Sequence, residues 1–123
     1  MRDRVVLRHI NAVRQGAGCE SLRQLPQAVP GDPHDCVFAR AWQAIDPAVT
    51  VQVDKVETTD ETFARIVAAE FGTKLLIEDG KIIGVKLPNA IKAWIKEFDS
   101  EGRAHLIDEQ AYAKAKQKVG AGA

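Results

Sequence analysis

Residues 74–98, KLLIEDGKIIGVKLPNAIKAWIKEF, decide the fold that the sequence predicts. Asp79-Gly80 lies between two apolar runs, which indicates a two-residue hairpin turn because both turn residues must adopt a positive φ. The turn fixes a register in which a charge pair lies nearest the turn. The predicted cross-strand pairs are Glu78–Lys81, Ile77–Ile82 and Leu76–Ile83.

A helix is predicted directly after this hairpin. Pro88 suits its first turn, where the missing N–H is not needed. The apolar residues that follow recur at helical spacing and form one face, which we expect to cover the hairpin. That face consists of Leu87, Ile91, Trp94, Ile95 and Phe98.

The rest of the chain supplies the cover for this unit. We expect a helix over residues 3–15, and a second over 32–45 with Asp32 as its N-cap. Alternating valines in 49–56 predict a half-buried strand. Helices behind a Thr58–Glu61 capping box and after Asp108 complete the chain.

The sequence therefore predicts an α+β fold. Its sheet is small, three-stranded and mainly antiparallel, with strands at 49–56, 73–78 and 81–87, and four to five helices flank it. We expect residues 1–119 to form a single globular domain and residues 120–123 a flexible tail. The large aromatic residues are predicted to fill the core, namely Phe38, Trp42, Phe63, Trp94 and Phe98.

Composition excludes some classes of function and favours none. The chain has 123 residues, with 17 basic and 17 acidic side chains, so its net charge does not draw it toward nucleic acid or anionic lipid. The charge is unevenly distributed, because residues 32–62 carry seven acids and two bases. No apolar run approaches the roughly 20 residues that span a bilayer, so we expect a cytoplasmic protein with no membrane contact.

Several short patterns resemble one known group of proteins. They are Asp32-Pro-x-Asp-Cys-x-x-Ala-Arg-Ala41, Leu87-Pro88, Trp94-Ile95 and Phe98-Asp99. The combination looks like small uncharacterised proteins of actinobacterial phages and prophages, and the likeness covers about half of the chain. The resemblance implies a phage-type accessory protein and no particular activity.

Cys36 is the candidate reactive thiol. The predicted helix places it in a first turn, where the helix dipole lowers a thiol pKa, and Arg40 follows one turn later. Asp35 acts in the opposite direction, and no histidine is positioned by spacing to act as a base. An inert small side chain is the reading that we favour.

The sequence gives less support to a metal site or to acid–base catalysis. His9, Cys19, His34 and Cys36 lack the spacing of a zinc site, so we predict no metal and no cofactor. The acidic pairs at 60–61 and 78–79 are explained by a helix cap and a turn. The sequence therefore predicts that the protein is not an enzyme.

Two function classes remain. The first is a protein-interaction or regulatory module with a protein partner from host or phage, and a homodimer is a possible form. The second is a weak nucleic-acid-binding protein that uses exposed cations. Solvated helix faces also explain these cations, which are Arg4, Arg8, Lys92, Lys96, Lys114, Lys116 and Lys118.

Overall fold

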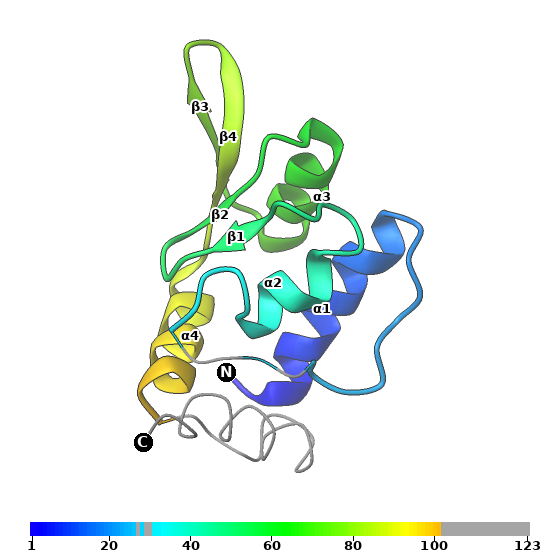
Figure 1. Cartoon of the computed structure of the whole chain (residues 1–123), viewed down its shortest axis with the longest axis vertical. Helices are drawn as coiled ribbons and strands as arrows, with labels where there is room; N and C mark the ends of the chain where they lie inside the picture. The colour runs from blue at the N-terminus through cyan, green and yellow to red at the C-terminus, as the bar shows by residue number, and fades with distance from the viewer. Residues whose placement is uncertain (27, 29–30, 102–123) are drawn as a thin grey trace.

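Four short strands form one antiparallel sheet in the computed structural model, which describes residues 1–26, 28 and 31–101. The sheet order is β1-β2-β4-β3, so β3 and β1 are the outer strands. Figure 1 shows the β3–β4 hairpin projecting away from the helices at one end of the molecule. The strands are β1 (Thr50–Val51), β2 (Lys55–Glu57), β3 (Leu75–Glu78) and β4 (Lys81–Lys86).

The predicted α+β class is confirmed, but the predicted number of strands is wrong. Residues 49–56 were expected to form one strand and instead fold back on themselves as β1 and β2. The Gln52 N–H donates to the Lys55 carbonyl at 2.9 Å and closes this turn. Val51 then lies opposite Val56, and both side chains are buried. The fold-back lets a short run bury valines from two adjacent strands.

The hairpin turn follows the prediction up to its second pair. Asp79 and Gly80 have φ values of 52° and 76°, and Glu78 pairs with Lys81. Ile77 pairs with Ile82 as expected. The third predicted pair is wrong, because the register shifts after Ile77 and places Leu76 opposite Gly84.

Gly84 lies at the position where the register shifts. β4 pairs with β3 on one side and with β2 on the other. A Cβ atom at Gly84 would lie 2.2 Å from the Val56 carbonyl oxygen, which no real side chain tolerates. The shift leaves Ile83 as an extra residue in β4, and only a glycine allows β2 to approach so closely at the next position.

Four helices are described. They are α1 (Asp3–Gly16), α2 (Val37–Trp42), α3 (Glu61–Phe71) and α4 (Asn89–Glu101). The expected α1 and α4 are present, and all five residues of the apolar face predicted for α4 are buried. The predicted helix after Asp108 and the tail at 120–123 lie outside the described residues.

Two predicted helix caps are wrong. α2 begins at Val37 with Cys36 as its N-cap, while Asp32 accepts the His34 N–H in a turn before the helix. α3 is capped by the Asp60 carboxylate, which accepts the Phe63 N–H at 3.0 Å. Thr58 has another role, since its hydroxyl donates to Asp46 Oδ2 at 2.6 Å and ties the start of α3 to the end of the α2 region.

The predicted aromatic core is confirmed. Phe38 and Trp42 lie with ring centroids 5.4 Å apart, and Phe38 packs edge-on against Trp94 at 5.6 Å. Phe63 of α3 packs against Trp42 at 5.7 Å. These contacts join α2, α3 and α4, and all the rings predicted for the core are at most 2% exposed. Such burial stabilises the fold by roughly 25 cal/mol per Å² of apolar surface.

Candidate functional site

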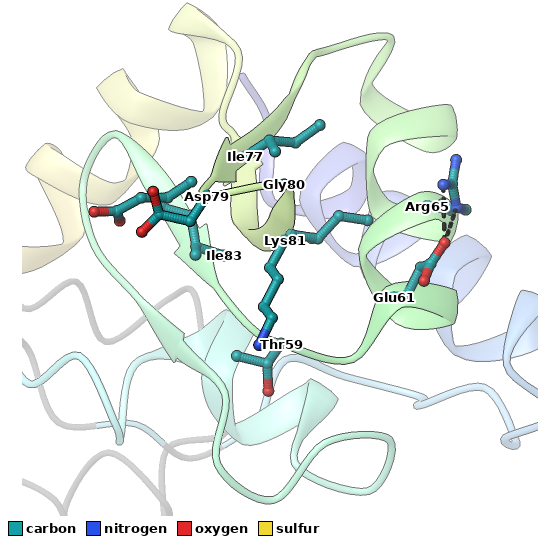
Figure 2. Close-up of a pocket in the computed structure, with 10 residues that line it drawn as sticks. Thr59, Glu61, Arg65, Ile77, Asp79, Gly80, Lys81 and Ile83 are labelled. Atoms are coloured by element: carbon teal, nitrogen blue, oxygen red, sulfur yellow. Dashed lines mark hydrogen bonds and ion pairs between the residues drawn. The ribbon is translucent and has the colours of Figure 1, made fainter.

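A surface hollow lies between the β3–β4 hairpin and the start of α3. Its volume is about 640 Å³, and Figure 2 shows side chains from both elements around it. We call it the hairpin groove. Its lining residues are Thr59, Glu61, Arg65, Ile77, Glu78, Asp79, Gly80, Lys81, Ile82 and Ile83.

The apolar part of the hairpin groove is unusually exposed. The Ile77 side chain is 62% exposed and that of Ile83 is 37% exposed. The described residues include one other large exposed apolar side chain, Met1 at the chain start. An exposed apolar side chain is common by itself, but here both isoleucines lie on one projecting hairpin while every large aromatic residue named above is buried. The hairpin is therefore where this fold leaves apolar surface in water.

Charged side chains rim the hairpin groove. Arg65 and Glu61 form an ion pair one helical turn apart on α3, with Nη2 and Oε1 at 2.9 Å. Glu78 faces Lys81 across the strands. In Figure 2 the Lys81 side chain extends toward Thr59. The lining contains no histidine, cysteine or serine.

A second hollow continues along the same strand. It has a volume of about 580 Å³ and is lined by residues of α3 and by the start of β3. Arg65 borders both hollows, and small side chains form the α3 wall of the second one. β3 is an outer strand of the sheet, so both hollows flank a strand that pairs on one side among the described residues. The second hollow is lined by Arg65, Ala68, Ala69, Thr73, Lys74 and Leu75.

Cys36 lies in a different place, beside a smaller hollow of about 270 Å³. Its side chain is 5% exposed, and its Sγ accepts the Ala39 N–H at 3.4 Å. Burial raises the pKa of the Cys36 thiol to about 11, because desolvation outweighs the hydrogen bonds from Ala39 and Phe38. The pKa shift is thus opposite in direction to the helix-dipole prediction. Whether the thiol reacts stays a hypothesis, and burial and pKa both oppose it.

The candidate nucleic-acid contacts are placed on two helices. Arg4 and Arg8 are both exposed, one turn apart on α1, and Lys96 is exposed on α4, where Lys92 is half-buried. Asp3 joins the two helices, since the Trp94 indole N–H donates to its carboxylate at 3.2 Å. Lys114, Lys116 and Lys118 lie outside the described residues.

Two of the residues considered as metal ligands, His9 and Cys36, have other hydrogen-bond partners. His9 Nδ1 lies 2.6 Å from Glu70 Oε2, and the His9 ring packs on Phe71 with centroids 5.3 Å apart. His9 thus links α1 to α3. Within residues 1–26, 28 and 31–101, no group of three or more histidine, cysteine, aspartate or glutamate side chains could hold a metal ion.

Sequence reasoning missed the exposure of Ile77. The hairpin was predicted correctly near its turn, but the apolar face of the following helix was expected to cover both of its strands. In the structure α3 makes the closer approach to the hairpin, and α4 packs on the aromatic core instead. The signal in the sequence was the charge pattern, because Lys74 and Glu78 enclose a run of only three apolar residues.

Comparison with known proteins yields no relative: no protein-family model matches the chain, and neither a curated protein nor a solved structure matches it. In the part of the chain that the structure describes, each helix is too short or too polar to cross a bilayer.

Proposed function

We propose that the protein is a non-enzymatic protein-interaction module that binds an extended segment of a partner along β3. One observation carries this proposal: β3 is an outer strand with a large apolar side chain, Ile77, that is 62% exposed. An outer strand offers unpaired N–H and C=O groups, and proteins commonly recognise extended peptides by adding them to such a strand. The phage-type origin suggested by the sequence patterns belongs to the same proposal.

The direction of the β3 backbone supports the proposal. The Lys86 N–H donates to the Lys74 carbonyl at 3.0 Å, so the backbone polar groups of Lys74 point toward β4. These groups alternate along an antiparallel strand, which turns those of Leu75 and Ile77 toward the free side. An added strand would therefore bond to Leu75 and Ile77.

The groove geometry supplies the second part of the recognition. A strand added beside β3 would place alternate side chains above the hollow between β3 and α3, where Ala68 and Ala69 leave room. Arg65 and Glu61 at the rim would contact polar groups of the partner. Backbone bonds would give affinity and the groove would give selectivity.

The test is a selection of displayed random peptides against the full chain, followed by hydrogen exchange on the best binders. We expect bound peptides to slow exchange of the Leu75 and Ile77 amides. Ile77→Pro should abolish binding, because proline removes an outward N–H without removing a bond to β4. Ile77→Thr keeps that N–H and is the matched control, which should retain part of the binding. Equal binding by Ile77→Pro and the wild type would refute the proposal.

Weak nucleic-acid binding is the alternative. It is supported by Arg4 and Arg8, which lie exposed and one helical turn apart, a spacing that lets both contact one phosphate backbone. A salt titration with generic duplex DNA tests it. The alternative predicts measurable affinity at about 50 mM salt. The logarithm of this affinity should fall as the logarithm of the salt concentration rises, and the slope should be smaller by about one in Arg8→Gln. The absence of binding at low salt would remove it.

A further inference from the structure

We infer that the segment which pairs with β3 is β3 of a second copy of this chain, so that two copies form an antiparallel dimer with Leu76 on the two-fold axis. This inference rests on the proposed function, because it names the partner of the same strand edge.

The backbone of β3 is compatible with itself in this register. Leu75 and Ile77 turn their N–H and C=O groups to the free side, as derived above from the bond between Lys74 and Lys86. When two β3 strands run antiparallel about Leu76, Leu75 of one copy faces Ile77 of the other, and these pairs exchange N–H···O bonds in both directions. Slipping one of the two strands by a single residue would instead set Leu76 of one copy opposite Leu75 or Ile77 of the other, and the N–H and C=O groups of Leu76, which point toward β4, could not complete the bonds.

The side chains match in the same register. Leu76 would meet its own copy across the axis, and Leu75 would lie beside Ile77 of the second copy. Ile77, 62% exposed in one chain, would thereby gain an apolar neighbour. Each apolar position of the strand thus faces an apolar position.

Charge complementarity selects the partner. Lys74 and Glu78 flank the apolar run, and both are exposed. In a pairing centred on Leu76, Lys74 faces Glu78 of the second copy, and the two-fold axis repeats this pair. Such positions are non-hydrogen-bonded pairs, where side chains of opposite strands lie closest. An unrelated partner strand would carry this self-complementary order of charges only by chance.

The other outer strand does not compete. β1 has two residues, Thr50 and Val51, too few for a stable ladder, whereas β3 with Lys74 offers five successive positions. The paired area is still small, so we expect a weak, concentration-dependent dimer rather than an obligate one.

The test is sedimentation equilibrium of the full chain from about 10 μM to about 1 mM, where a weak dimer separates from a monomer. Lys74→Glu and Glu78→Lys are each expected to weaken self-association by about 30-fold, because two attractive pairs become two repulsive ones. An equimolar mixture of these two variants should form a heterodimer, in which every facing pair is again opposite in charge. The double variant K74E/E78K should regain the wild-type dimer.

The double variant is the matched control, because it carries the same local changes as both single variants and differs only in how the two copies meet. A wild-type chain that stays monomeric over the whole range would overturn the inference. A dimer whose dissociation constant is unchanged in the two single charge-reversal variants would overturn it as well. If peptide capture at β3 persists in a monomeric chain, the proposed function stands and only the second copy is wrong; if Ile77→Pro affects neither, both are wrong.

Discussion

The aromatic core and the β3–β4 hairpin use apolar side chains in opposite ways. In the core, Phe38 packs against both Trp42 and Trp94, and these three side chains from two helices are almost completely buried. On the hairpin, Ile77 and Ile83 remain in contact with water. Under the proposed function, stability and recognition reside in separate parts of this small fold. Changes in the core should alter folding, and a change at the exposed Ile77 should mainly alter association.

The largest effect is expected at Trp42, which lies between the rings of Phe38 and Phe63 and donates its indole N–H to the Ile10 carbonyl at 3.4 Å. Trp42→Ala should lower the free energy of unfolding by about 4 kcal/mol, because it leaves a cavity in the core. Urea denaturation measures the change. Trp42→Phe is the control and should cost less; a loss below about 1 kcal/mol in Trp42→Ala would contradict the described core.

The next effect concerns the buried thiol of Cys36 and depends on pH. Its pKa is raised from 9.0 to about 11 in the folded chain. Below pH 9 the thiol is therefore neutral in both the folded and unfolded states, and its burial does not make the free energy of unfolding depend on pH. Between pH 9 and 11 the unfolded thiol ionises first, and the free energy of unfolding should fall by up to about 3 kcal/mol relative to Cys36→Ala. Denaturation of both proteins at pH 8, 9 and 10.5 measures this difference.

A parallel fall in both proteins would show that other groups cause the pH dependence. The thiol itself can be checked by alkylation at pH 7, where Cys36 should react far more slowly than the half-exposed Cys19. A faster reaction at Cys36 would restore the hypothesis of a reactive thiol.

Gly84 tests the boundary between the two regions, because β4 there pairs with both β2 and β3. Gly84→Ala should lower the free energy of unfolding by about 2 kcal/mol, since the added Cβ would collide with the Val56 carbonyl oxygen. Ile83→Ala, at the adjacent exposed position, is the control and should change stability little. Equal effects of the two substitutions in thermal or urea denaturation would show that the close approach of β2 does not matter.

The smallest effect on stability is expected at Ile77. Ile77→Thr should change the free energy of unfolding by no more than about 0.5 kcal/mol, because the side chain is 62% exposed. The same variant should weaken association at β3, which isothermal titration with a selected peptide measures. A large loss of stability would show that Ile77 contributes to folding, which would contradict the separation between core and hairpin.

How much of this could be read from the sequence depended on the kind of signal. The hairpin turn and the apolar face of α4 were predicted because Asp79-Gly80 and a period of 3.6 residues are local signals. The start of α2 was predicted wrongly, at Asp32 instead of Cys36, because both side chains can cap a helix and the local sequence does not choose between them. The fold-back at residues 52–54 was missed because no glycine marks it. Local patterns determined the elements; their ends needed tertiary contacts.

The candidate site was less predictable than the fold. Exposure of Ile77 depends on which helix covers the hairpin, and that is a property of the whole chain rather than of residues 74–83. The raised pKa of Cys36 depends on burial, which overrides the nearby helix end. The predicted cations Arg4 and Arg8 are exposed as solvated helix faces usually are, so the structure leaves their role a proposal.

The enclosure of both tryptophans has a practical consequence. Because the indoles of Trp42 and Trp94 are at most 1% exposed, their intrinsic fluorescence will report melting of the core and remain silent when something attaches to the hairpin. An optical assay for a ligand therefore requires a reporter introduced near the tip, for example a dye at position 83. Any fluorescence change of the native chain on mixing would indicate rearrangement of its interior.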